Sequence, residues 1–93
     1  MIKNVIKRDG TKEPFDAERI KQAITTAARD AEIPKERGEE VAATIVQSLL
    51  KRLEGREDVP TSEIRKGALA ELQDIEPTAA QAWRTYDREH GRE

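Results

Sequence analysis

The spacing of apolar residues divides the chain into a short extended region followed by four amphipathic segments. The first fifteen residues hold two β-segments, Ile2 to Arg8 and Thr11 to Phe15. Beyond them, apolar residues recur every three or four positions, the period at which an α-helix places side chains on one face. The pattern therefore predicts a β-hairpin over 2–15 and helices over about 16–30, 36–54, 62–75 and 77–89.

The dipeptide Asp9-Gly10 is the strongest local signal for the hairpin. It supplies the positive φ values that a two-residue type I′ turn requires. Such a turn would place Lys7 opposite Lys12, while Pro14, which lacks an N–H, limits how far the second strand can pair. Because a lone hairpin is only marginally stable in water, we expect it to pack on the helices.

The second helical segment is the most hydrophobic of the four. Its apolar face is wide and stops at Gly55, a residue type that often follows a helix. We expect this helix to form the spine of the core. Its apolar residues are Val41, Ala42, Ile45, Val46, Leu49, Leu50 and Leu53.

Polar residues predict where the other helices begin and end. Asp16 occupies an N-cap position before the first helix, and Thr61 offers a cap for the third. Between the second and third helices, residues 56–60 form a polar linker. The segment 87–93 contains no apolar residue and is expected to be frayed.

These elements predict one small domain, 1–93, of α+β class and mainly α, in which an N-terminal β-hairpin caps a four-helix bundle. Ninety-three residues support a single hydrophobic core. Charged residues make up 39% and hydrophobic residues 35% of the chain. Because the hydrophobic residues are periodic, this composition indicates a thin-cored helical domain with a heavily solvated surface, and not disorder.

Composition excludes several classes of function. The chain has no cysteine, which rules out disulfides, thiolate zinc sites and thiol chemistry. No run approaches the roughly 18 apolar residues of a membrane span and no signal-peptide core is visible, so we expect a cytoplasmic protein. A net charge of −2 favours neither a nucleic-acid-coating surface nor binding to anionic membranes. No known catalytic motif is present, and we expect no active site.

Clustered charge on the hairpin is the clearest chemical signal. Lys7, Arg8 and Lys12 place three cations on one short hairpin, and a polyphosphate is a suitable ligand for such a group. Alternatively, these cations protect an exposed edge strand from pairing with another chain. Since adjacent strand residues point to opposite faces, Lys7 and Arg8 reach one phosphate group only if the ligand wraps around the hairpin end.

Other polar and aromatic positions have a structural interpretation beside a functional one. Asp16 is first a helix cap, and Thr61 lies where the N–H groups of a helix start also bind phosphate. Trp83 and Tyr86 fit a core better than a stacking role, although their exposure beside the small-residue fourth helix would create an apolar patch for self-association. His90 falls in the polar tail and is expected to be an exposed side chain.

Three motifs along the chain belong together. They are the run Val5-Ile6-Lys7-Arg8-Asp9-Gly10-Thr11-Lys12-Glu13-Pro14-Phe15-Asp16 followed by Ile20 and Ala23-Ile24, the run Pro60-Thr61-Ser62-Glu63-Ile64, and the segment Trp83 to Tyr86. This combination resembles the ATP-cone, the nucleotide-binding regulatory domain at the N-terminus of many ribonucleotide reductase large subunits and in a bacterial repressor of their genes. The resemblance spans essentially the whole chain and implies a β-hairpin folded over a four-helix bundle.

The resemblance also implies a nucleotide site between the hairpin and the helices. Its ligand would be ATP or dATP, with Mg²⁺ on the phosphates and no metal ligand from protein side chains. Val5 and Ile20 would lie against the adenine, and Glu13 and Asp16 would hydrogen-bond the base, with Arg19 near the base pocket. The residues implied at the phosphates are Lys7, Arg8, Thr61 and Arg65.

The resulting hypothesis is a non-catalytic ATP/dATP-binding regulatory module whose nucleotide state alters contacts with a ribonucleotide reductase-type partner or with a second copy of itself. The alternative is a helical protein-interaction domain that has lost nucleotide binding. A helix-turn-helix DNA binder is disfavoured by the net charge of −2 and by a third helix of mixed charge. Because reductases need several cysteines and the repressor carries a cysteine zinc ribbon, we expect a cone alone, either a stand-alone protein or an excised domain.

Overall fold

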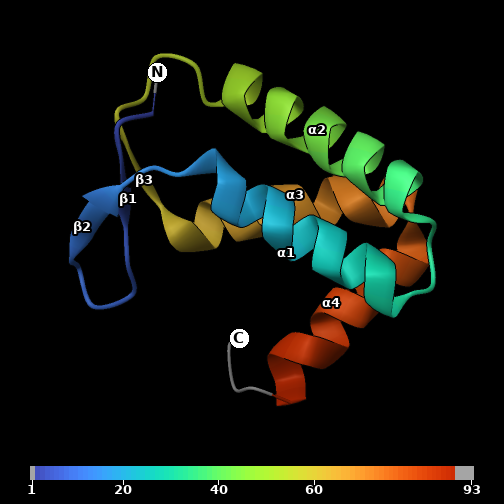
Figure 1. Cartoon of the computed structure of the whole chain (residues 1–93). Helices are drawn as coiled ribbons and strands as arrows, with labels where there is room; N and C mark the ends of the chain where they lie inside the picture. The colour runs from blue at the N-terminus through green and yellow to red at the C-terminus, as the bar shows by residue number, and fades with distance from the viewer. Residues whose placement is uncertain (1, 90–93) are drawn as a thin grey trace.

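Four helices and a small sheet form the part of the chain that the computed structural model describes, residues 2–89 (Figure 1). The predicted α+β class, mainly helical, is confirmed. The sheet lies at one end of the helices, and α2 and α4 lie on opposite sides of α1. The elements are β1 (Asn4–Ile6), β2 (Lys12–Pro14), α1 (Ala17–Asp30), α2 (Lys35–Arg52), β3 (Asp58–Pro60), α3 (Thr61–Ile75) and α4 (Pro77–Glu89).

The helices pack in a ring around one core. Helix α1 packs on α2 and α4, and α3 packs on the same two helices. At the contact between α2 and α3, Gly67 comes so close to Leu49 that a Cβ there would lie 2.8 Å from Leu49 Cδ2. The absence of a side chain at this position therefore permits the close approach of the two helices. The largest fully buried side chains are Ile24, Ile45, Leu72, Val41 and Val59.

A third strand completes the sheet where the sequence predicts only a polar linker over 56–60. Strand β3 pairs in parallel with β1, with Asn4 opposite Asp58, and the strand order is β2-β1-β3. Its central residue, Val59, is fully buried. A three-residue strand with one such apolar side chain carries no period of its own, so only tertiary pairing reveals it. The predicted two-stranded hairpin is therefore part of a three-stranded sheet.

The turn between β1 and β2 has three residues and not the predicted two. The Lys7 N–H donates to the Thr11 carbonyl at 2.8 Å, and the Gly10 N–H donates to the Lys7 carbonyl at 2.9 Å. Only Gly10 has a positive φ here, of 88°. The Asp9 carboxylate instead accepts the Thr11 backbone N–H at 2.9 Å. This is a type I turn closed by a glycine bulge.

The corrected turn shifts the register of the hairpin by one residue. Val5 lies opposite Glu13, and Ile6, instead of Lys7, lies opposite Lys12. Because side chains two residues apart share a face, Lys7 joins Val5 and Glu13 on one side of the hairpin. The register thus places a cation and a carboxylate together on the face that looks toward the helices.

The two ends of α1 are fixed by different devices. Asp16 caps its start as predicted, with the carboxylate accepting the Glu18 N–H at 3.0 Å. At the other end, the Ile33 N–H donates to the Ala28 carbonyl at 2.9 Å, the bond that defines a Schellman turn. This turn holds Glu32 at φ 63°, a left-handed conformation that strains a residue with a Cβ.

The predicted cap of α3 is wrong, because Thr61 is the first helical residue. The N-cap position belongs to Pro60, and no side chain caps this helix. Thr61 therefore lies in the first turn of the helix and not at the position before it.

The helix predicted over about 77–89 is confirmed as α4, so the fraying expected for the whole segment 87–93 is wrong for residues 87–89. Helix α4 continues to Glu89, and Asp87 is only 7% exposed. The expectations for His90 and the rest of the tail lie outside the described residues. Trp83 is 6% exposed and packs in the core, so it does not supply the exposed apolar patch that the sequence suggests for self-association.

Candidate functional site

A cavity of about 190 Å³ lies where the sheet meets the first turns of α1 and α3 and the side of α4. Eight of the nine residues predicted for a binding site line it, although they come from the hairpin, from α1 and from α3. The fold thus brings together residues as distant in the sequence as the first strand and the third helix. The eight are Val5, Lys7, Glu13, Asp16, Arg19, Ile20, Thr61 and Arg65.

Arg8 is the one predicted residue that does not line this cavity. It lines a larger adjoining hollow of about 690 Å³, which shares Lys7, Thr61, Arg65 and Trp83 with the cavity. We call this space the basic hollow, because six cationic side chains and one carboxylate line it. The charged residues are Lys7, Arg8, Arg65, Lys66, Arg84 and Arg88, with Asp87 as the carboxylate.

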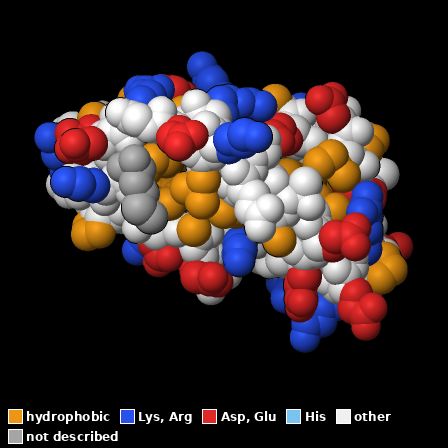
Figure 2. Space-filling view, turned by 90° about the horizontal axis from the view of Figure 1, so that it is seen from above, with side chains coloured by type: hydrophobic (Ala, Val, Ile, Leu, Met, Phe, Trp, Pro, Cys, Tyr) orange, Lys and Arg blue, Asp and Glu red, His pale blue; other side chains and the backbone are white. Residues whose placement is uncertain are grey.

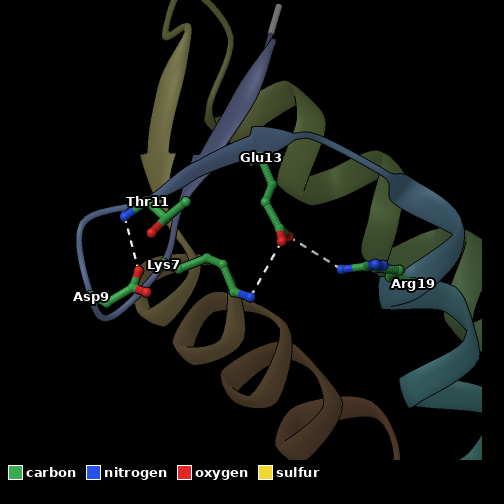
Figure 3. Close-up of polar contacts among 5 residues, drawn as sticks. All are labelled: Lys7, Asp9, Thr11, Glu13 and Arg19. Atoms are coloured by element: carbon green, nitrogen blue, oxygen red, sulfur yellow. Dashed lines mark hydrogen bonds and ion pairs between the residues drawn. The ribbon is translucent and has the colours of Figure 1, made fainter.

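Glu13 lies between two cations at the cavity (Figure 3). Its Oε1 is 3.3 Å from Lys7 Nζ, and its Oε2 is 3.4 Å from Arg19 Nη1. All three side chains are at least one-third exposed. Exposed ion pairs contribute about 0–1 kcal/mol each, so a ligand can replace these contacts with little loss of stability.

The hairpin tip is held by Asp9 and Thr11, as Figure 3 also shows. Hydrogen bonds from the Thr11 side chain and then from its backbone N–H lower the pKa of Asp9 below its ordinary value. The ionised carboxylate therefore stabilises the turn at whose start Lys7 and Arg8 lie.

Apolar side chains complete the cavity wall, and six of them were not among the residues predicted for the site. A signal was present for α3, because Thr61, Ile64 and Ala68 follow the spacing of one helix face. The cavity therefore combines charged groups with apolar surface, a combination that is typical of small-molecule sites. The six are Pro14, Phe15, Ala23, Ile64, Ala68 and Trp83.

The start of α3 also forms part of the wall through Thr61. Since no side chain caps this helix, its first N–H groups and its dipole favour an anion at this end. Within residues 2–89, no group of three or more His, Cys, Asp or Glu side chains is placed to hold a metal ion.

Arg65 separates the cavity from the basic hollow and lines both. Its guanidinium donates to the carboxylate of Asp87, and its Cζ lies 5.4 Å from the centroid of the Trp83 ring. The two partners are four residues apart on α4, so both present their side chains to α3.

The face shown in Figure 2, which is seen from above, differs from the basic hollow in its distribution of charge. Acidic and basic side chains alternate there, with hydrophobic groups between them. The cations of the basic hollow are, by contrast, concentrated around one space.

In the described part of the chain, no helix has the length and apolar character needed to cross a membrane.

A small sheet covers one end of a helical bundle, and a cavity lined by both charged and apolar side chains lies at their junction. The profile of the ATP cone domain matches residues 3–92 of this sequence. The chain therefore belongs to the ATP-cone family of nucleotide-binding regulatory domains.

Comparison with curated proteins finds relatives of two kinds. The anaerobic ribonucleoside-triphosphate reductase of Escherichia coli is 40% identical over 65 residues, which are 70% of this chain and 9% of the reductase. The transcriptional repressor NrdR of Geobacter metallireducens is 33% identical over 81 residues, covering 81% of this chain and 49% of the repressor. That of Hyphomonas neptunium is 30% identical over 73 residues, covering 78% and 45%. The chain thus spans less than half the length of each of these relatives.

Proposed function

We propose that this domain is a non-catalytic regulatory module that binds ATP or dATP in the cavity, with Mg²⁺ on the phosphates. The observation that carries the proposal is the convergence of eight predicted residues on one cavity, beside a hollow with six cations and one carboxylate. A nucleoside triphosphate carries three to four negative charges and an apolar ring, and this combination complements both parts of the site.

The roles proposed for the residues follow from their positions. Lys7, Thr61 and Arg65 lie at the boundary of the cavity and the basic hollow and contact the phosphates. Arg8 reaches the same phosphates from the hollow, so the ligand extends past the end of the hairpin. Because Lys7 and Arg8 are adjacent in the chain and point to opposite faces, both can contact one ligand only if it wraps around the end of the hairpin. The proposed position of the phosphates meets this condition.

The base is proposed to lie in the cavity itself. Val5 and Ile20 contact the adenine ring, and the carboxylates of Glu13 and Asp16 accept hydrogen bonds from its amino group, with Arg19 beside the base. Binding would replace the present contacts of Glu13 with its two cations. Guanine carries an oxygen where adenine carries this amino group, so we expect GTP to bind more weakly.

Regulation is proposed to act on an attached or associated partner of ribonucleotide reductase type, or on a second copy of this domain. A nucleotide can shift such contacts only if it binds two conformations with different affinity. Light scattering of the protein alone, with ATP and with dATP tests the second copy, and one monomer mass throughout would exclude it.

Thermal unfolding with and without nucleotide tests binding. At about one hundred times its dissociation constant, ATP with Mg²⁺ should stabilise the domain by roughly 2.7 kcal/mol, a melting shift on the order of 10 °C. GTP and AMP serve as controls for the base and for the phosphates. A melting temperature indifferent to millimolar ATP and dATP would reject the proposal and favour the alternative, a protein-interaction domain without nucleotide binding.

A further inference from the structure

Arg65 and Trp83 occupy a junction in the molecule. Both line the cavity and the basic hollow, and both also line a third space between α1 and α4. Arg65 is bonded to Asp87 and lies over the Trp83 ring. The side chain proposed to contact phosphate is therefore the same one that ties α3 to the last turn of α4.

Asp87 depends on this contact more than Arg65 does. The side chain of Asp87 is 10% exposed, whereas that of Arg65 is 39% exposed. A buried carboxylate that loses its cation is strongly unfavourable. Its position in the last turn of α4 adds to this, because the helix dipole disfavours negative charge at a C-terminus.

Bound phosphate would compete directly with Asp87. Asp87 is the only carboxylate among the described residues that line the basic hollow, so it repels an anion there while holding one of the cations. Each hydrogen bond that Arg65 makes to phosphate weakens its hold on this carboxylate. The bound phosphate and the Asp87 carboxylate therefore compete for the hydrogen bonds of the Arg65 guanidinium.

We infer that Arg65 is shared between the bound phosphates and Asp87, so that nucleotide binding loosens the last turn of α4. The inference rests on the proposed function and names the element through which binding is transmitted. The end of α4, far from the hairpin in the sequence, then reports whether the site is occupied.

Linkage makes the inference quantitative. If nucleotide weakens the Arg65–Asp87 contact, then removing the charge of Asp87 must strengthen nucleotide binding by the same factor, and such couplings are typically about 5- to 150-fold. Asp87→Asn keeps the shape of the side chain and removes its charge. We expect this variant to bind ATP about tenfold more tightly than the parent protein. Glu89→Gln, which removes an exposed carboxylate of the same turn, is the matched control and should bind as the parent does.

Amide hydrogen exchange locates the effect. In the parent protein, ATP with Mg²⁺ should slow exchange in β1 and the first turn of α1 and speed it about tenfold at residues 85–89, the factor that a coupling of about 1.4 kcal/mol represents. Fluorescence of Trp83, the single tryptophan, should change in the same titration because Arg65 moves relative to its ring. Arg65→Gln provides a second variant, in which residues 85–89 should exchange rapidly without any nucleotide.

The outcomes separate the two proposals. If ATP protects β1 and α1 but leaves residues 85–89 unchanged, the inference is overturned and the proposed function stands. Unchanged or weaker ATP binding by Asp87→Asn also overturns it, because Asp87 would then position Arg65 for phosphate and not compete for it. The same holds if Arg65→Gln leaves the last turn as protected as in the parent. If ATP changes exchange nowhere, the proposed function fails and the inference fails with it.

Discussion

The side of the molecule formed by α2 and the end formed by the sheet bury their apolar residues to different depths. On α2, Ile45 and Leu49 are 0% and 3% exposed. At the sheet end, Val5, Phe15 and Ile20 pack only partly against the core and also line the cavity. Val5, Phe15 and Ile20 therefore keep apolar surface accessible at the cavity, whereas Ile45 and Leu49 have almost none.

This contrast separates stability from binding. The near-complete burial of Ile45 and Leu49 supplies hydrophobic stabilisation. The partial burial of the apolar cavity wall leaves part of that stabilisation to be gained when a ligand covers the surface. The ion pairs of Glu13 follow the same pattern, because they are exposed and weak. Substitutions on the two sides should therefore change different measured quantities.

The largest expected effect on stability is that of Ile45→Ala. Because Ile45 is fully buried, its truncation removes apolar contacts and leaves a cavity, which together destabilise a protein by about 2–5 kcal/mol. Urea unfolding followed by circular dichroism measures this change.

Ile20→Ala is the matched deletion in the cavity wall. Since Ile20 is only partly buried, it should lower the free energy of unfolding by about 1 kcal/mol while reducing the melting shift produced by ATP. Equal destabilisation by the two variants would mean that the sheet end and α2 share one core, and the contrast drawn above would be lost.

Lys7→Ala and Arg8→Ala should change binding while leaving stability nearly unaffected. Each removes charge-assisted hydrogen bonds to phosphate worth about 1.5–3 kcal/mol, so the affinity for ATP should fall about ten- to a hundredfold. Calorimetric titration measures the affinity. Lys51→Ala, which removes an exposed lysine of α2, is the control. Normal ATP binding by both hairpin variants would leave these cations with the role of protecting an edge strand.

Glu32→Gly should stabilise the protein without touching the site. Glycine adopts the left-handed conformation of this position without strain, and the expected gain is about 0.5–1 kcal/mol. Glu32→Ala removes the same charge but keeps the Cβ, so it should give no comparable gain. Similar unfolding energies for the two variants would attribute any change to charge and not to backbone strain.

The smallest effect concerns pH and Asp58, which links the three strands. The hydrogen bond from Lys12 and then that from Asn4 lower the pKa of Asp58 below its ordinary value of 3.8. A carboxyl with a lowered pKa in the folded state stabilises the protein above its unfolded pKa and loses this contribution as pH falls through the folded value. Asp58→Asn should therefore lose less stability than the parent protein between pH 5 and the acid range below the ordinary pKa. Parallel losses in urea unfolding would show that this carboxyl does not contribute.

The helices could be predicted because their signal is local. Helix α2 runs from Lys35 to Arg52, where the apolar period predicts 36–54. Each apolar residue of this pattern lies one turn from the next, so a short window of sequence contains the information. The cap by Asp16 was visible for the same reason.

The strand β3 and the register of the hairpin depend on contacts that no short window contains. Val59 is a single apolar residue in a polar segment, and its burial follows from pairing with β1. The Asp9-Gly10 dipeptide is compatible with turns of two or three residues, and the hydrogen bond from Thr11 accompanies the longer one.

Some residues of the candidate site could likewise be found from the local sequence, whereas others depend on tertiary packing. The cations of the hairpin are neighbours in sequence and could be found there. Lys66, Arg84 and Arg88 join them only because α3 and α4 pack side by side and lead to the basic hollow. Asp87, which the polar tail composition suggested to be frayed, is buried through its contact with Arg65.

The parallel pairing of β1 with β3 also has a consequence for the order of folding. Asn4 donates to Asp58 at 3.2 Å across 54 positions of the chain. Contacts within and between consecutive helices close short loops, whereas this pairing closes a loop that contains α1 and α2, at a greater loss of chain entropy. We therefore expect the sheet, and the cavity beneath it, to form after the rate-limiting step.

In stopped-flow experiments, Val59→Ala should speed unfolding and leave the folding rate nearly unchanged, whereas Ile45→Val should slow folding. If Val59→Ala slows folding as much as it destabilises the protein, the sheet forms early instead. Because Thr61, Arg65 and Trp83 line the cavity and follow β3 in the chain, a chain still leaving the ribosome cannot complete its site until α3 and α4 have emerged.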